Sequence, residues 1–306
     1  MLNLIKNKIY RLDTHTLEVL KKSSSSLIVK VIGMAAGFAA SIILGRTIGS
    51  EGLGIIDLAN RVVGVVLMLA MLGFNNVILK EIAFAYERKD WQHIADTMYT
   101  AFRINIPLAL VLSVILILLT PWLAENFFNE PQLKVPLIIA IVVVVPQVLS
   151  DIFALGVNGF RKIWQSSLVK NTLSSALVAV GLLILLLLKI EITIINVAII
   201  YAIGRVTVTF VMGTYWKQLF KFSGKRTPQT RKMLKVALPL LVVSATTMIA
   251  SNGDTIMLGW LSSTREVGIY SVASRLGLLT SFFHMLTVSS LTPKIAALHG
   301  QNKKAE

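Results

Sequence analysis

The feature that most constrains this chain is a series of apolar runs, each long enough to cross a lipid bilayer. About 20 consecutive apolar residues span the hydrocarbon core as a helix. The runs are too long for strands and lack the polar–apolar alternation of a membrane barrel. We therefore predict an all-α, polytopic membrane protein. Its eight expected helices cover 27–48, 55–78, 98–120, 133–155, 166–188, 192–214, 236–261 and 267–290.

The composition agrees with this interpretation and limits the partners. The 306 residues are 55% hydrophobic and 15% charged, with a mean hydropathy of +0.74. Cysteine is absent, which excludes disulfides and thiolate–metal sites. The net charge of +15 first suggests a nucleic-acid partner, but the predicted inner segments hold 20 Lys and Arg and the outer segments hold 2. This bias places the N-terminus in the cytoplasm, and we expect no nucleic-acid partner.

A long-range repeat organises the chain. The stretch GRTIGSEGLGIIDLANR (Gly45–Arg61) recurs 214 residues later as GWLSSTREVGIYSVASR (Gly259–Arg275). The register needs no gap and gives 13 identities over 50 paired positions. Six helices separate the two copies, so both cross the membrane in the same sense. Such a parallel repeat predicts two like lobes related by an axis along the membrane normal.

The repeat also predicts the domain organisation. One unit is 214 residues long, but only 92 residues follow it, which leaves two helices of an expected six. We therefore expect the sequence to be a fragment, with a natively short protein that relies on a partner as the alternative. The expected parts are a basic cytoplasmic leader (1–26), a first six-helix lobe (27–214), a basic cytoplasmic linker (215–235) and the start of a second lobe (236–306).

The two hairpins at the repeats resemble those of lipid-linked oligosaccharide flippases. In that family a proline opens the seventh helix, an aspartate precedes the outer turn, and a V-G-I-Y-S run follows it. Here these are Pro239, Asp254 and Val267–Ser271. The family comprises the O-antigen and capsule repeat-unit translocases of bacteria, within the multidrug/oligosaccharidyl-lipid/polysaccharide exporter superfamily. The resemblance covers both hairpins, covers the middle of the chain only by hydropathy, and does not indicate the sugar. The family usually has twelve or more helices.

Three arginines at membrane depth are the candidate substrate-binding residues: Arg61, its repeat mate Arg275, and Arg205. A charge at the centre of a membrane helix costs about 2.5–3.5 kcal/mol, so each one needs a partner, a lumen or a route to the surface. The guanidinium pairs bidentately with phosphate oxygens. These arginines therefore predict a cationic cavity for a diphosphate headgroup. The alternative is structural pairing, since Asp57 lies four residues before Arg61 on one helix face.

Four further charged residues are candidates for ion coupling or gating: Asp254, Asp57, Arg103 and Asp151. Asp254 suits either a coupling cation or proton, or an arginine partner. Arg103 and Asp151 fall toward the inner ends of their spans, where they predict an inner gate or a simple salt bridge. Lys170 has a stem long enough to reach the interface.

The resulting hypothesis is a flippase in the bacterial cytoplasmic membrane that moves polyprenyl-diphosphate-linked oligosaccharide for surface polysaccharide synthesis. Membrane lipids are expected partners, and polymerase or export machinery stays open as another. A drug/cation antiporter of the same superfamily and a non-transporting scaffold of a polysaccharide-assembly complex are the alternatives. No Walker loop, metal-ligand spacing or nucleophile constellation is visible. We therefore expect a transporter rather than an enzyme, with no cofactor.

Overall fold

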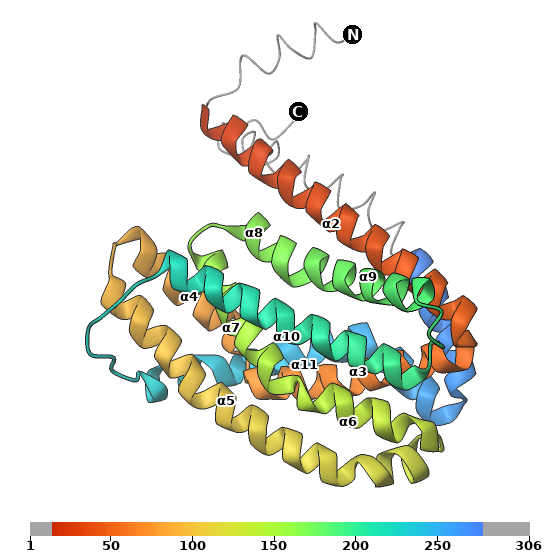
Figure 1. Ribbon diagram of the computed structural model, residues 1–306. Helices are drawn as coiled ribbons and strands as arrows, with labels where there is room; N and C mark the ends of the chain where they lie inside the picture. The colour runs from red at the N-terminus through yellow and green to blue at the C-terminus, as the bar shows by residue number, and fades with distance from the viewer. Residues whose placement is uncertain (1–13, 278–306) are drawn as a thin grey trace, which may run out of the picture.

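The computed structural model describes residues 14–277, with side chains from residue 31 onward. This part of the chain is mostly helical and contains no strand, which confirms the all-α prediction (Figure 1). The main helices are α2 (Thr14–Thr47), α3 (Gly49–Met71), α4 (Phe74–Glu87), α5 (Trp91–Trp122), α6 (Lys134–Val142), α7 (Val144–Gly159), α8 (Ile163–Ser167), α9 (Ser174–Leu187), α10 (Ile194–Leu219) and α11 (Thr230–Leu261). Two π-helical segments (Leu123–Phe127 and Leu168–Leu173), a 3₁₀ turn (Pro131–Leu133) and a helical stretch at 264–277 complete the fold.

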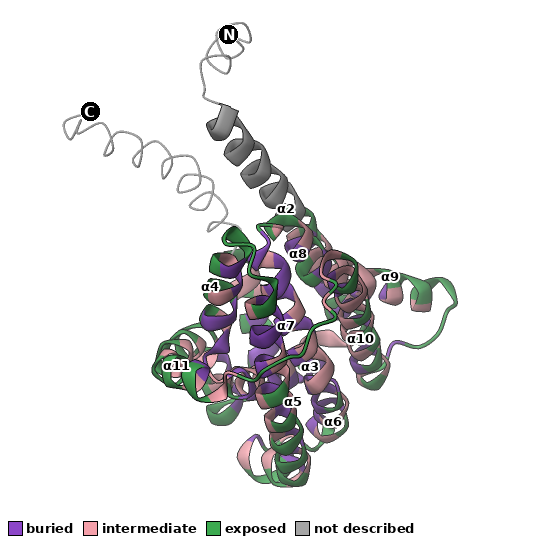
Figure 2. Cartoon of the chain, turned by 90° about the vertical axis from the view of Figure 1, so that its left-hand side faces the viewer, coloured by how far each residue is buried: buried purple, intermediate pink, exposed green. Residues whose placement is uncertain are grey.

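Length and composition make this a multi-pass membrane protein. Five described helices are long and apolar enough to cross a membrane, or six if the bent pair α6 and α7 forms one span. Over its most apolar stretch, 56% of α3 is buried, against 11% for α11. α3 therefore lies at the centre of the bundle, and its neighbours expose apolar faces around it (Figure 2).

Helices lie in the predicted order, but only five or six of the eight predicted spans are long and apolar enough to cross a membrane in the described residues, and several helix ends differ. α2 begins at Thr14, inside the stretch expected to be a leader. α4 and α5 reduce the expected inner connection from 79–97 to 88–90. The helices continue into polar and charged residues here, because a helix outside the lipid does not need apolar side chains. Residues 1–13 of the leader and 278–290 of the eighth span lie outside the described residues.

The second span is broken at Leu72 and Gly73, which the hydropathy did not predict. Both adopt left-handed backbone angles, with φ of 47° and 75°. A Cβ on Gly73 would overlap the backbone of α11 at Ala237 and Leu241. The break and the missing side chain therefore let α11 approach the junction of α3 and α4 closely.

The fourth span bends by 43° between α6 and α7. The bend falls at Val143, three residues before Pro146. Proline has no N–H for the carbonyl of Val142, and its ring crowds that carbonyl, so the helix turns away there. Thr209 of α10 donates its hydroxyl to the Pro146 carbonyl at 2.8 Å, which fixes the bent span against α10.

The basic linker is docked on the first lobe. Its non-helical part covers 220–229, shorter than the expected 215–235. Asp96 of α5 is 4% exposed and accepts hydrogen bonds from the Thr227 amide at 2.7 Å and the Thr227 hydroxyl at 2.8 Å. The Gln92 amide donates to Asp96 at 2.9 Å and to the Lys225 carbonyl at 2.7 Å. Asp96 thus holds the connection to α11 in place. We call this end of the bundle the Asp90 end, and the opposite end, where α2 meets α3, the Gly49 end.

Candidate functional site

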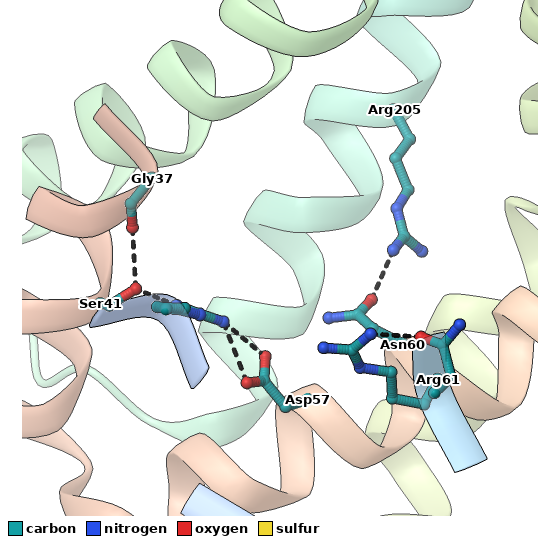
Figure 3. A network of polar contacts seen from close by, with 8 residues as sticks. Gly37, Ser41, Asp57, Asn60, Arg61 and Arg205 are labelled. Atoms are coloured by element: carbon teal, nitrogen blue, oxygen red, sulfur yellow. Dashed lines mark hydrogen bonds and ion pairs between the residues drawn. The ribbon is translucent and has the colours of Figure 1, made fainter. Parts of the chain in front are cut away.

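One stretch of α3 gathers the polar side chains at the centre of the bundle. It carries Asp57, Asn60 and Arg61, each of which points to a partner on another helix (Figure 3). Buried polar groups are costly unless they are hydrogen-bonded. The partner of each charged side chain therefore shows whether its charge is neutralised.

Asp57 is neutralised by Arg275, its partner from the second repeat. The Arg275 guanidinium donates from Nη2 to both carboxylate oxygens, at 2.7 and 3.0 Å. It also donates to the Ser41 hydroxyl, which in turn donates to the Gly37 carbonyl at 2.8 Å. Asp57 is 6% exposed. The pair therefore joins the 264–277 helix to α2 and α3 in a largely desolvated setting.

The pairing suggested by spacing, Asp57 with Arg61, does not form. The Asp57 carboxylate is occupied by Arg275, and Arg61 instead donates to the side-chain oxygen of Asn252 on α11. A cross-lobe contact has thus replaced the local i,i+4 pair. Arg61 is held by a neutral amide, so its charge is not cancelled by a direct ion pair in the described residues.

Asp254 lies two residues beyond Asn252 but is held within the second hairpin. Its carboxylate accepts from the Tyr270 hydroxyl and from the Thr255 amide, the latter at 2.7 Å. Asn252, on the same helix, accepts from Arg61. The structure therefore brings Arg61, Asn252 and Asp254 together at the boundary between the repeats.

Arg205 lies apart from that boundary, inside the first lobe. It donates to the side-chain oxygen of Asn60 (Figure 3). The Gln147 amide, turned so that its oxygen faces the guanidinium, accepts from Nη1 at 3.2 Å. Arg61 and Arg275 thus join the two repeats, and Arg205 lines a cavity of the first lobe. One cavity shared by all three arginines stays a prediction.

Arg103 and Asp151 do not pair. The Asp151 carboxylate accepts from the Lys170 ammonium at 2.7 Å, whereas Arg103 is exposed and has no ion pair within the described part of the chain. Lys170 thus reaches across to α7 instead of extending alone to the interface. The salt bridge expected between Arg103 and Asp151 is absent here because a nearer cation already occupies the carboxylate.

The two repeats touch at a symmetric pair of glycines. A Cβ on Gly54 would overlap the Thr264 carbonyl, and a Cβ on Gly268 would overlap the Ser50 carbonyl. Gly54 and Gly268 are repeat mates, and so are Ser50 and Thr264. Exchange of the same contacts between two copies is the signature of a two-fold interface. Glu130 adds a further tie by accepting from the Thr264 hydroxyl at 2.8 Å.

The sequence reasoning missed the neutral members of the network. Asn60, Gln147 and Asn252 hold the arginines, and Ser41 bridges Arg275 to α2. Each is an uncharged polar residue inside an apolar span, which is the signal that identifies helix-to-helix hydrogen bonds in membranes. A search limited to charged residues could not find them.

Comparisons with known proteins agree with the architecture. The family described as "Polysaccharide biosynthesis protein" matches residues 19–299. No curated protein matches the chain significantly.

Solved structures share the fold at low sequence identity. One is a structure of the MATE multidrug transporter DinF-BH, at 17% identity and a TM-score of 0.62, covering 92% of this chain and 65% of that one. Another is an inward-facing conformation of a multidrug resistance MATE family transporter of the MOP superfamily. It matches at 17% identity with a TM-score of 0.61, covering 92% of this chain and 66% of that one. A chain named protein A matches at 15% identity with a TM-score of 0.69, covering 92% of this chain and 65% of that one. The present chain thus spans about two thirds of the length of these structures.

Proposed function

The chain belongs to the polysaccharide biosynthesis protein family, and from this premise we propose that it is a lipid-linked oligosaccharide flippase. The proposed substrate is a polyprenyl-diphosphate-linked oligosaccharide, and the proposed membrane is the bacterial cytoplasmic membrane with the N-terminus inside. The lipid tail stays in the bilayer while the headgroup crosses between the two lobes. No covalent chemistry is required of the chain.

The observation that carries this proposal is the pair of repeat-related arginines at the boundary between the repeats. Arg61 reaches from α3 to α11, and Arg275 reaches from the second repeat to α2 and α3. Both guanidiniums therefore lie where a headgroup between lobes would pass. Arg61 has only a neutral amide as its direct partner, which leaves its charge available to a phosphate oxygen.

Arg275 supports a coupling between substrate binding and movement of the lobes. Its guanidinium is occupied by the Asp57 carboxylate, which offers two acceptor oxygens side by side, as a phosphate also can. A diphosphate that approaches Arg61 competes with Asp57 for Arg275. Release of Asp57 removes the strongest polar tie near the Gly54–Gly268 contact, so the repeats can separate at the Gly49 end.

Alternating access also needs contacts that re-form without side-chain rearrangement. Gly54 and Gly268 provide this because backbone meets backbone there, with no rotamer to reset. In the opposite state these contacts would open while the Asp90 end closes. The docking of the linker on Asp96 keeps the start of α11 beside α5 during that movement.

A drug/cation antiporter is the second candidate, favoured by the multidrug transporters that share the fold and by Asp254. A cationic drug needs an acidic surface that is not already paired. Asp57 is bound to Arg275, whereas Asp254 accepts hydrogen bonds only from the neutral groups of Tyr270 and Thr255 in the described residues. This boundary therefore offers one cation, Arg61, and one carboxylate, Asp254, without a direct ion pair in that part of the chain. The two repeat-related arginines favour an anionic headgroup as the substrate. A scaffold without transport makes no use of these arginines.

Reconstituted vesicles test the proposal. The protein and its R61Q and R275Q variants would be given a fluorescent polyprenyl-diphosphate oligosaccharide, and transfer between leaflets measured by quenching. Loss of one charge-assisted contact of about 1.5–3 kcal/mol predicts at least an about tenfold slower transfer. The control is R46Q, which removes an exposed arginine of α2. Equal transfer by all four proteins would overturn the assignment of Arg61 and Arg275, and ordinary transfer of a cationic dye instead would favour the antiporter.

A further inference from the structure

The first lobe contains a polar cavity that the proposed diphosphate site does not use. Its volume is about 290 Å³, and it lies among α3, α7, α9, α10 and the π-helical segment Leu168–Leu173. Arg61 and Arg275 are not among its lining residues. Its polar lining consists of Asn60, Gln147, Ser150, Asp151, Lys170 and Arg205, with Ser174 at the side.

The charges in this cavity do not balance. Lys170 is neutralised by Asp151 at 2.7 Å. Arg205 is bound only by the amides of Asn60 and Gln147, and no carboxylate in the described residues pairs with it. The lining therefore carries one net positive charge. A charge removed from water is costly unless it is paired, so the cavity favours a negatively charged occupant.

One hydrogen-bond donor that lines the cavity also lacks an acceptor. Ser150 is 4% exposed and lines the cavity, and its hydroxyl has no hydrogen-bond partner in the described part of the chain. Buried hydroxyls are almost always hydrogen-bonded, so an unpartnered one beside a cavity calls for a partner that is not protein. Ser150 and Arg205 together offer the planar cation and the neutral donor that an oxyanion needs.

We propose that this cavity binds an oxyanion, a carboxylate or a phosphate, between Arg205 and Ser150. The Asp151–Lys170 pair sets the affinity, because it holds one cation neutral and leaves the other free. The volume lies at the lower limit of ordinary ligand pockets, which begin at about 300 Å³, and suits a small anion or one acidic sugar. Two sources share this chemistry: a free anion from solution, and an acidic group of a transported saccharide. The first source does not depend on whether the protein is a flippase, whereas the second rests on the proposed function.

Thermal unfolding of the purified chain in detergent tests the site without any lipid substrate. Potassium phosphate and potassium glucuronate would each be compared with potassium chloride at equal ionic strength. A ligand that binds only the folded state raises Tm. We expect a rise in the wild type and in the control R46Q, no rise in R205Q, and a smaller rise in S150A. D151N frees Lys170 and therefore should respond at lower anion concentrations than the wild type.

A second variant and a local readout keep the test decisive. R205K keeps the charge but loses the planar fork, so it should need about tenfold more anion for the same rise in Tm. Hydrogen exchange should slow at 147–151 and 203–209 when the anion is added. A response to both anions supports binding of free oxyanions, and a response to glucuronate alone supports an acidic sugar. Equal responses in wild type, R205Q and R46Q, or no response to either anion, would overturn the proposal.

Discussion

At the residue scale, the pair formed by Asp57 and Arg275 has a direct consequence for stability. Asp57→Asn leaves a mostly buried guanidinium without its carboxylate, which should destabilise the fold by about 3 kcal/mol. The matched control is Glu87→Gln, which breaks an exposed pair with Arg161 and should cost less than about 1 kcal/mol. Denaturant unfolding in detergent measures both. Equal effects for the two variants would show that Asp57 and Arg275 are not coupled as the structure indicates.

The same pair shows what sequence reasoning can and cannot find among charged residues. Arg61, Arg205 and Arg275 stand out because each interrupts an apolar run. The only local pairing available was Asp57 with Arg61, four residues apart. The carboxylate is taken instead by Arg275, 218 residues away, because tertiary packing brings a second cation closer. Partners of this kind depend on helix packing, which no short spacing encodes.

At the element scale, apolar length predicted the existence and order of the helices, but not their breaks. Hydropathy treats 55–78 as continuous, yet the chain turns at Leu72 and Gly73, and this break lets α11 approach closely there. The bend at Val143 had a visible cause in Pro146. The polar ends of the helices were underestimated, since α4 and α5 extend beyond the apolar residues. An apolar run predicts which part of a helix lies in the lipid, but the helix itself can extend beyond that part.

The contact between the repeats predicts a strong effect of adding one methyl group. In Gly54→Ala or Gly268→Ala the new Cβ meets a backbone carbonyl that cannot change rotamer. Each variant should therefore destabilise the protein by about 3 kcal/mol, the upper range for overpacking. Gly45→Ala is the control, because nothing lies within 4 Å of its Cβ and alanine favours a helix over glycine by about 1 kcal/mol. Thermal unfolding distinguishes them: Gly45→Ala should keep or raise Tm, and a similar loss in all three would argue against the contact.

The docked linker predicts a change in local protection. Asp96→Asn weakens the charge-assisted hydrogen bonds from Thr227 and Gln92, each worth about 1.5–3 kcal/mol. The segment 220–229 should then open more often, and trypsin should cut after Lys225 and Arg226 several-fold faster than in wild type. Glu125→Gln, which removes an exposed carboxylate near Lys134, serves as the control. Unchanged cleavage in Asp96→Asn would show that Asp96 does not hold the linker.

At the scale of the whole molecule, the repeat was the most informative part of the sequence. It paired Gly54 with Gly268 and Arg61 with Arg275, and the structure places both pairs at the boundary between the repeats. The cavity inside the first lobe was beyond sequence reasoning. Its polar lining comes from four separate parts of the chain, at 60, 147–151, 170–174 and 205. Several of these residues are neutral, so neither charge nor spacing marks them.

The central claim is that the boundary arginines recognise the diphosphate of a lipid-linked sugar. Its most direct test is the transfer rate of two fluorescent lipids in vesicles that contain the protein. They carry the same oligosaccharide on the same polyprenyl chain, one through a diphosphate and the other through a neutral linkage. We predict at least an about tenfold faster transfer of the diphosphate form, the consequence of one charge-assisted contact, and loss of that preference in R61Q. Equal rates for the two lipids in the wild-type protein would contradict the account.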